Sequence, residues 1–347
     1  MASTRVRDIM DIVRTSGVRN AWALLRQSRE VCRLARPTAW VHALIALEKC
    51  DLNTALASAE GVDLDVRSDL DRQALSTICE YLYETGVLEM PRAHVYRARN
   101  RRRFGAMLEA MYGCLAYHEP LQAVDRILRR EWSYGRDVTR DDRYDAIASA
   151  ALTSRFSYEF SFAVLARAAP AGLVDVGCGT GEYLSFLRSK GFAGRLCGMD
   201  LSDDAITEGK RCGHGSQADL FRGDLFELPM AAASGKLEAV DVVSFMFVLH
   251  EFDDASVRTA LAAVRGSLER PRVLLTELIA RSTSETRRER RTAFPELKLV
   301  HQLSGQRLRT PDRWEELFAE AGLSAVERRI NQLTNHVAIL FAQGGRG

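Results

Sequence analysis

Three acidic residues follow three successive β-rich runs, and the first of them precedes a glycine-rich turn. Asp175 lies two residues before the glycines of GCGTG, Asp200 ends the run RLCGMD, and Asp224 ends DLFRGD. Glycine lets a backbone adopt positive φ and approach a ligand where a Cβ would clash. Asp200 follows Asp175 at close to the spacing of about 20 residues that places a carboxylate on ribose hydroxyls. An acid on the first strand favours a cationic nucleoside ligand over a pyrophosphate.

Two histidines stand where they could act on a second molecule. His250 and Glu251 follow the run DVVSFMFV, and His301 lies in LVHQL. An imidazole at a strand end can take a proton from a phenol at neutral pH, with an adjacent carboxylate to orient it. If His301 converges on His250, the pair suits an iron or zinc ion that keeps positions open for substrate oxygens. A lone His301 would instead donate a hydrogen bond to the substrate.

These residues require a sheet whose strand ends meet at one edge. After Gly172, helical segments alternate with seven short β-rich runs: LVDVG, RLCGMD, DLFRGD, DVVSFMFV, RVLLTEL, AVERRI and HVAILFA. This alternation predicts the α/β class, with a seven-stranded, doubly wound, Rossmann-like sheet. Ligands of such sheets bind at the carboxyl ends of the strands. The three acids and His250 are therefore expected at the ligand-binding edge.

The N-terminal half has helical apolar spacing almost throughout. Residues 40–99 indicate three helices, the third from Arg72 to Thr85 and stopped by Gly86, and then the hairpin VLEMPRAHVYRAR. This order is typical of a winged helix, and the arginines at 97–103 could suit DNA. Fused to a catalytic-looking half, the module is better interpreted as a dimerisation domain. We expect it over residues 1–145, with the α/β domain over 146–347 and a bridging helix over 150–168.

Composition sets further limits on partners and compartment. The 347 residues carry a net charge of only +2, which predicts neither a nucleic-acid partner nor an acidic tail. The start of the chain lacks the order of a signal peptide, and no apolar run approaches the ~18 residues of a membrane span. The seven cysteines form no C-x-x-C pair, as expected in a reducing compartment. These features predict a cytoplasmic protein that acts on a small molecule, without a membrane or nucleic-acid partner.

From Leu173 to Ala342, the glycine turn and strand-end acids resemble the class I S-adenosylmethionine-dependent methyltransferases. A final hairpin with a reversed last strand is typical of that family. The resemblance implies S-adenosylmethionine as cofactor, with its parts held by the following residues: the methionine portion by Asp175, Gly177 and Gly179, the ribose by Asp200 and Leu201, the adenine by Asp224 and Leu225, and a further contact from Phe245.

The segment around His250 is similar to the V-L-H-D-W-x-D motif of small-molecule O-methyltransferases, which are built on a winged-helix dimerisation domain. In that family the histidine is the general base. The family's later G-K-E-R-T segment is QRLRT here, so Leu308 stands where a supporting glutamate is expected. Glu277 matches the family's other acid. This likeness implies a homodimer and O-methylation of a phenolic compound with His250 as base.

His301 and the acid after His250 give a closer resemblance to the α-keto acid C-methyltransferases of nonribosomal-peptide pathways. In that group two histidines hold iron or zinc, and the first is followed by an acidic residue, as His250 is by Glu251. The resemblance implies methylation of the β-carbon of a 2-oxo acid. A guanidinium suits the carboxylate of such an acid, and Arg136 is the candidate. A run of arginines at 287–291 would form a solvated helix face.

Metal-assisted C-methylation of a 2-oxo acid is therefore the leading hypothesis, and O-methylation with His250 as base is the alternative. A different class remains open, a transcriptional regulator that kept a methyltransferase-like sensor domain. The complete set of Asp175, Asp200 and Asp224 disfavours it.

Overall fold

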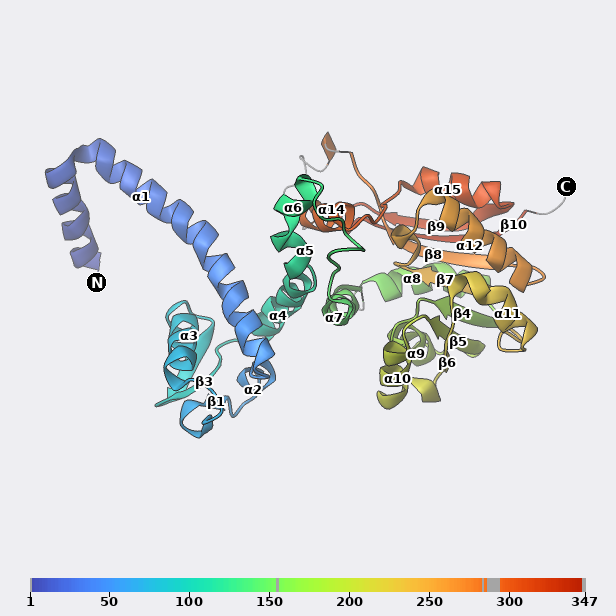
Figure 1. Cartoon of the computed structure of the whole chain (residues 1–347), viewed down its shortest axis with the longest axis horizontal. Coiled ribbons are helices and arrows are strands. Elements are labelled where there is room, and N and C mark those ends of the chain that lie inside the picture. Colours follow the sequence, from blue (N-terminus) through green and yellow to red (C-terminus); the bar gives the residue numbers. More distant parts are fainter. Residues whose placement is uncertain (1, 154–155, 283, 286–293, 345–347) are drawn as a thin grey trace. The chain divides into compact units, whose positions relative to one another are not determined.

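A computed structural model describes residues 2–153, 156–282, 284–285 and 294–344 of the chain. The arginines at 287–291 lie outside the described residues. The chain divides into two compact units, Met1–Leu115 and Ala116–Gly347 (Figure 1). The division falls after Leu115 and not after residue 145, where the sequence prediction had placed it. Residues 116–145 make contacts with the rest of the second unit, for example from Arg140 Nη1 to Glu251 Oε1 over 2.9 Å.

The first unit is built on helix α1, Ala2–Lys49, which bends where Gly17 adopts φ 82° (Figure 1). Its further helices are α2 (Asn53–Ala57), η1 (Leu64–Val66), α3 (Arg72–Glu84) and α4 (Arg101–Ala116). Its strands are β1 (Val62–Asp63), β2 (Leu88–Arg92) and β3 (Val95–Ala98), ordered β1-β3-β2 with antiparallel pairing. The predicted third helix and the hairpin are both present. Gly86 has φ 77°, which explains why α3 ends just before it.

Helices and strands alternate through most of the second unit. Its helices are α5 (His118–Gln122), α6 (Val124–Leu128), α7 (Asp142–Thr153), α8 (Ser157–Leu165), η2 (Ala166–Ala168), α9 (Glu182–Ser189), α10 (Asp203–Arg211), η3 (His214–Ser216), η4 (Leu225–Glu227), α11 (Leu228–Ala233), η5 (Leu249–Glu251), α12 (Asp254–Ser267), α14 (Phe294–Leu303) and α15 (Pro311–Glu320). The expected bridging helix over 150–168 is represented by the end of α7, by α8 and by η2.

The seven strands of this unit form one sheet. They are β4 (Gly172–Val176), β5 (Arg195–Asp200), β6 (Asp219–Arg222), β7 (Val242–Met246), β8 (Arg272–Leu278), β9 (Leu323–Asn331) and β10 (His336–Gln343). Their order is β6-β5-β4-β7-β8-β10-β9. The first five are parallel, and β10 runs antiparallel to both of its neighbours. The predicted doubly wound sheet and its reversed last strand are confirmed.

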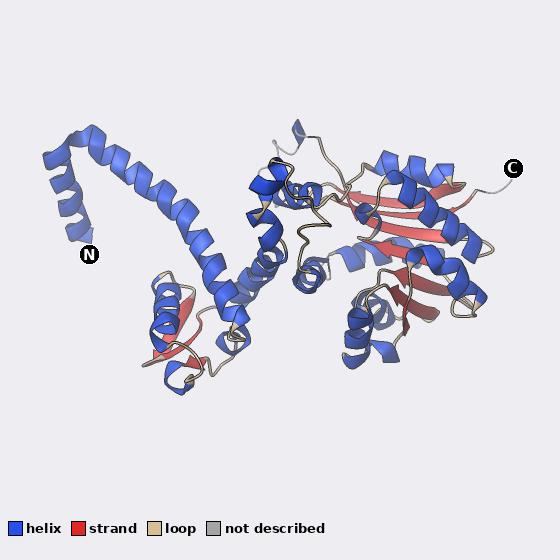
Figure 2. Cartoon of the chain, viewed as in Figure 1, coloured by secondary structure: helices blue, strands red, loops and turns tan. Residues whose placement is uncertain are grey.

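Two separate cores show that both faces of this sheet are covered. One core joins strand residues such as Val174 and Val243 to α12 and α15, whereas the other joins Leu173 and Val242 to α8 and α9. Neighbouring residues of a strand point to opposite faces, so adjacent positions enter different cores. Figure 2 shows helices on both sides of the strands. The sheet is therefore rigid, and the loops that carry the predicted site residues leave it at the carboxyl ends of the parallel strands.

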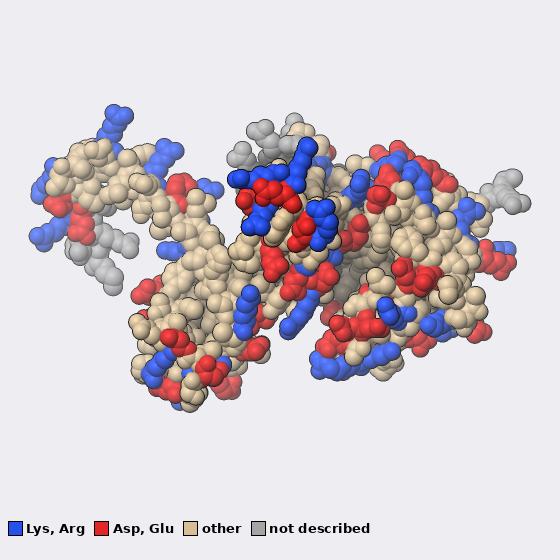
Figure 3. All heavy atoms as spheres, in the orientation of Figure 1, with Lys and Arg blue, Asp and Glu red and all other residues tan. Residues whose placement is uncertain are grey.

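The described part of the chain contains no helix that is both long enough and apolar enough to cross a membrane. In the view of Figure 3, acidic and basic side chains are interspersed over the second unit.

Candidate functional site

The turn between β4 and α9 has a backbone that needs glycine. Gly177, Gly179 and Gly181 adopt φ of 73°, 54° and 83°. Residues that have a Cβ rarely adopt such positive φ values. A Cβ on Gly177 would lie 2.6 Å from a methyl group of Val248, so this glycine also permits close packing. A Cβ on Gly179 would meet no atom within 4 Å. The turn is thus packed on one side and open at Gly179.

The acids at the ends of β5 and β6 are held in place by backbone donors. Gly179 N–H donates to Asp200 Oδ2 over 2.8 Å, and Ser202 N–H donates to Asp200 Oδ1 over 2.9 Å. Asp224 Oδ1 accepts from Phe226 N–H over 2.9 Å. Both carboxylates are half-buried, and Leu201 is exposed. Asp200 therefore fixes the glycine turn while staying accessible to a ligand.

Asp175 is buried without a partner for one of its oxygens. Its side chain points to the face of the sheet that also carries Ser244 and Gly198, its register neighbours on β7 and β5. Among the described residues, Oδ1 has no hydrogen-bond partner. Burial raises the pKa of this carboxyl to about 7, and the charge of Asp200 contributes in the same direction. Such a carboxyl is suited to receive a cationic group.

Two residues that the sequence assigned to the cofactor have side chains in the core. Leu225 is 7% exposed and Phe245 is completely buried, and both belong to the cluster that packs against α12. Phe245 follows Ser244 on β7, so it points to the face opposite Asp175. The exposed side chain beside Asp224 is that of Phe226, whose ring meets Phe252 edge-on at 5.7 Å. The sequence analysis did not name Phe226, because it assigned the residue next to the acid, Leu225.

His250 forms a buried pair with Glu277. It lies in η5, just after β7, and is 5% exposed, whereas Glu277 on β8 is completely buried. Glu277 Oε1 accepts from the His250 backbone N–H over 3.1 Å, and Oε2 lies 2.8 Å from Nδ1. Burial alone would lower the pKa of His250, but the Glu277 carboxylate outweighs it and raises that pKa. The carboxylate accepts a hydrogen bond from the proton on Nδ1, which fixes the tautomer and leaves Nε2 as the reactive nitrogen.

His301 lies beside His250. The two ring centroids are 5.2 Å apart, although the residues come from η5 and α14. His301 Nδ1 lies 2.6 Å from the carbonyl of Leu297, one turn earlier in the helix, so it is the donor nitrogen. Burial and the neighbouring His250 lower the pKa of His301 to about 4. Among the described residues, neither Nε2 has a hydrogen-bond partner, so both nitrogens are available as ligands.

Glu251 lies at the edge of this pair and is held by two side chains. Its Oε1 is 3.7 Å from His250 Nε2, and it accepts from Arg140 Nη1 over 2.9 Å and from Gln306 Nε2 over 2.6 Å. Gln306 is buried, and Arg140 is 18% exposed at its side chain. The carboxylate therefore has a fixed direction.

Arg140 is the arginine that contacts Glu251, the carboxylate beside the histidine pair. Arg136, the candidate from the sequence, has a side chain that is 72% exposed, and its guanidinium is bonded to the adjacent Asp137 over 2.8 Å. Arg140 also contacts Asp142 and Asp145, so several carboxylates share its charge. No sequence signal separated the two arginines, because both lie in one charged segment.

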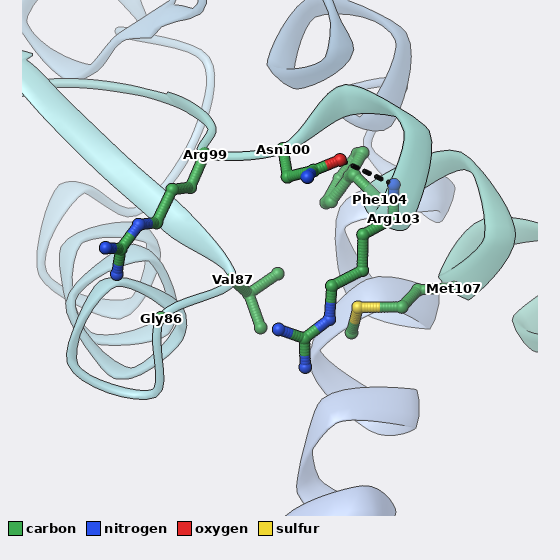
Figure 4. Close-up of a pocket in the computed structure, with 7 residues that line it drawn as sticks. All are labelled: Gly86, Val87, Arg99, Asn100, Arg103, Phe104 and Met107. Atoms are coloured by element: carbon green, nitrogen blue, oxygen red, sulfur yellow. Dashed lines mark hydrogen bonds between the residues drawn. The ribbon is translucent and has the colours of Figure 1, made fainter.

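Two cavities lie away from these residues. One of about 280 Å³ in the first unit contains none of the predicted site residues (Figure 4) and is lined by Gly86, Val87, Arg99, Asn100, Arg103, Phe104 and Met107. The other, of about 480 Å³, is lined by Arg195, Lys210, Gly215, Ala218, Asp219, Leu220, Phe221 and Lys236. Neither cavity is lined by a residue that the sequence predicted for the site.

Comparison with known proteins identifies the family of the α/β unit. A family model described as a methyltransferase domain matches residues 143–328. The 2-ketoarginine methyltransferase of Streptomyces arginensis is 27% identical over 205 residues, which are 56% of this chain. The matched part spans 58% of the length of that relative.

Several solved structures share the whole architecture. The mitomycin 7-O-methyltransferase MmcR superposes with a TM-score of 0.66 at 16% identity, over 94% of this chain and 100% of its own. LepI in complex with SAH and a substrate analogue gives 0.65 at 16%, over 99% of both chains. The pyocyanin biosynthetic protein PhzM gives 0.59 at 15%, over 92% of this chain and 100% of its own. At these identities the likeness shows the fold.

Proposed function

Because the chain belongs to the methyltransferase-domain family and is an S-adenosylmethionine-dependent methyltransferase, we propose that it methylates the β-carbon of a 2-oxo acid in natural-product biosynthesis. The observation that carries this proposal is the pair of adjacent imidazoles, His250 and His301, each anchored through Nδ1 and unbonded at Nε2 among the described residues. The similarity to a 2-ketoarginine methyltransferase supports the same class of acceptor.

The residues around the glycine turn fit S-adenosylmethionine, which supplies an electrophilic methyl group on a sulfonium. We assign the cationic methionine portion to Asp175, whose unpartnered buried oxygen needs a donor or a positive charge. The open side of Gly179 gives room for that portion. Asp200 takes the ribose hydroxyls, and Asp224 takes the adenine amino group with Phe226 beside it.

The pH dependence of cofactor binding tests the role of Asp175. Its pKa of about 7 lies above the ordinary 3.8, so the folded protein without cofactor keeps a proton that the unfolded chain releases. Stability of this form is therefore expected to fall as the pH rises from about 4 to about 7, and then to level off. Affinity for S-adenosylmethionine should rise through about pH 7, because only the carboxylate attracts the cation.

Asp175→Asn should remove this dependence and weaken binding about tenfold at pH 8, as loss of about 1.4 kcal/mol implies. Isothermal titration calorimetry at several pH values measures it. The amino group of the ligand titrates equally for both proteins, so the difference between the curves belongs to Asp175. Asp219→Asn, at an exposed acid on β6, is the matched control and should follow the wild type. Parallel curves for Asp175→Asn and the wild type would contradict the assignment.

The histidine pair fits a divalent iron or zinc ion. Each Nδ1 donates to an oxygen of the protein, the arrangement that orients metal-binding imidazoles. Among the described residues no group of three or more His, Cys, Asp or Glu side chains has the arrangement of a metal site. A cation held by His250 and His301 alone would keep positions open for the carboxylate and keto oxygens of the substrate. It would supply Lewis acidity, which makes the β-hydrogens of a 2-oxo acid more acidic.

The remaining tasks fall to side chains of this chain. Glu251, fixed by Arg140 and Gln306, is placed to accept the β-proton directly or through water. The β-carbon then forms its bond to the methyl group as the sulfur–carbon bond breaks, and S-adenosylhomocysteine leaves. The rigid sheet edge aligns the two reactants, which is the main contribution to such a transfer.

Exchange of the β-hydrogens tests this proposal without methyl transfer. In deuterium oxide, with S-adenosylhomocysteine and no methyl donor, the protein should exchange the β-hydrogens of its 2-oxo acid, as followed by NMR. A panel with guanidino, aromatic and aliphatic side chains identifies the acceptor, and S-adenosylmethionine should then add one methyl group to carbon. Exchange that is absent for the whole panel, with no methylated product, would falsify C-methylation.

The His250–Glu277 pair favours one second candidate, O-methylation of a phenolic compound. A buried carboxylate that holds the Nδ1 proton leaves Nε2 able to take a phenol proton. That reaction needs neither His301 nor a metal ion. Methylation on oxygen that survives chelator treatment would support it over C-methylation.

The N-terminal unit is proposed to build a homodimer, with the winged-helix assignment kept as a prediction. Helix α1 exposes large apolar side chains, including Val18, Trp22 and Leu34, which are 67–70% exposed. Such residues on one helix support burial against a second copy.

A further inference from the structure

A buried guanidinium holds the backbone that carries His250. Arg309 is 5% exposed and follows the described end of α14. Its Nη1 donates to the carbonyl of Leu249 over 3.3 Å and to that of Arg307 over 3.1 Å. Its Nη2 donates to the carbonyl of Phe252 over 2.7 Å, and Nε donates to Asp254 Oδ1 over 2.8 Å. Leu249 and Phe252 flank His250 and Glu251, so Arg309 binds both ends of their turn.

Four of the five N–H groups of the Arg309 guanidinium donate hydrogen bonds. Its Nη2 also lies 2.8 Å from Asp254 Oδ1, within ion-pair distance. Its Cζ also lies 4.6 Å from the ring centre of the buried Trp314. A buried charge is costly unless it is fully paired. The paired geometry therefore makes the guanidinium a rigid cross-link and not a mobile surface group.

The same segment contacts the histidine pair at two more points. Arg307 N–H donates to the carbonyl of His250 over 2.7 Å, and Gln306 N–H donates to that of His301 over 2.8 Å. The bridge between Ile279 and Arg309 ties the segment to the end of β8, two residues beyond Glu277. The position of the His250 backbone relative to Glu277 and His301 thus depends on this strip of chain.

We propose that Arg309 is a positioning residue that sets the direction of the His250 imidazole by clamping residues 249–254. The inference rests on the proposed role of His250 at the reacting centre. It holds equally for carbon or oxygen as the methyl acceptor.

Arg313 provides a matched control. It also pairs with Asp254, through Nη2 over 2.6 Å, but its other ion pair is with Glu316, and its side chain is 35% exposed. Arg309→Met and Arg313→Met each remove one arginine from Asp254, and only the first removes the donors to Leu249 and Phe252. Arg309→Lys keeps a positive charge near Asp254 but cannot reach three carbonyls with a planar fork.

The experiment compares kcat, the dissociation constant of S-adenosylmethionine, the thermal midpoint and the NMR signals of labelled His250 across these variants. Arg309→Met should lower kcat about 100-fold, as a displacement of about 1 Å does, with cofactor affinity within about twofold of wild type. Arg313→Met should keep kcat within about twofold. Arg309→Lys should recover much of the thermal midpoint but not kcat, and its His250 signals should stay shifted. If the role of Arg309 were purely structural, Arg309→Lys would restore the thermal midpoint and kcat together.

Equal kcat for Arg309→Met and Arg313→Met, beside an inactive His250→Ala, would overturn this inference alone. Wild-type activity in His250→Ala would overturn the proposed role of His250 and this inference with it. If Arg309→Met does not fold, Arg309→Lys carries the test, and wild-type kcat in that variant counts against the clamp.

Discussion

Replacing His301 with alanine is expected to remove bound metal and to lower kcat on 2-oxo acids by more than about 100-fold. Even loss of a group that only orients a metal ligand costs up to about that factor, and this change removes a ligand itself. Affinity for S-adenosylmethionine should stay within about twofold, because Asp175, Asp200 and Asp224 are untouched. Elemental analysis, calorimetry and steady-state kinetics on one preparation measure the three quantities.

The same measurements on His250→Ala separate the two candidate reactions. C-methylation requires both histidines, so both variants should lose metal and activity. O-methylation requires His250 as base, and His301→Ala would then keep most of its activity. His94→Asn is the control for a histidine change, since His94 is exposed at the β2–β3 turn with φ 60° and Asn tolerates that conformation. Stoichiometric metal retained by both alanine variants would refute the two-histidine site.

Glu277→Gln is expected to lower kcat by about 10⁴-fold, the loss seen when the acid that orients a catalytic histidine becomes an amide. Glu277 accepts two N–H donors from His250, one from the backbone and one from Nδ1. An amide offers one oxygen, and its NH₂ group must then face a donor. The imidazole avoids that clash by carrying its proton on Nε2 instead of Nδ1. A protonated Nε2 can neither bind a metal ion nor accept a proton.

The NMR tautomer of labelled His250 identifies this cause. The wild type should carry the proton on Nδ1, and Glu277→Gln should carry it on Nε2, with cofactor affinity unchanged. Glu327→Gln makes the same chemical change on β9, where Glu327 pairs with Arg167 at the surface, and it should behave as wild type. An unaltered tautomer together with an undiminished kcat would show that Glu277 has no orienting role.

The fold of the second unit could be predicted from the sequence because its signals are local. A strand of alternating or continuous apolar residues and a turn that needs glycine are each encoded within about ten neighbouring residues. The predicted runs became β4 to β10, and the positive φ values of Gly177, Gly179 and Gly181 explain the glycine spacing. The shared location of Asp175, Asp200 and Asp224 could be predicted too, because parallel strands end at one edge of a sheet.

The directions in which side chains point could be predicted less well from the sequence. Leu225 and Phe245 were expected beside the cofactor, and the structure buries both in the core. A sequence shows that a residue lies at a strand end. The face of the sheet to which its side chain points depends on how the strand pairs with its neighbours. Phe245 pairs with Val176, so it shares the face that packs against α12 and not the face of Asp175.

The fold that binds the cofactor could be predicted from local pattern and residue type, and the same signals singled out His250 and His301 as candidates. Which other side chains lie close to these histidines depends on tertiary packing. Arg140 was selected over Arg136 by its contact with Glu251, 111 residues away, and Arg309 reaches Asp254 across 55 residues. Such contacts depend on how distant segments pack, and no short-range periodicity in the chain encodes that packing.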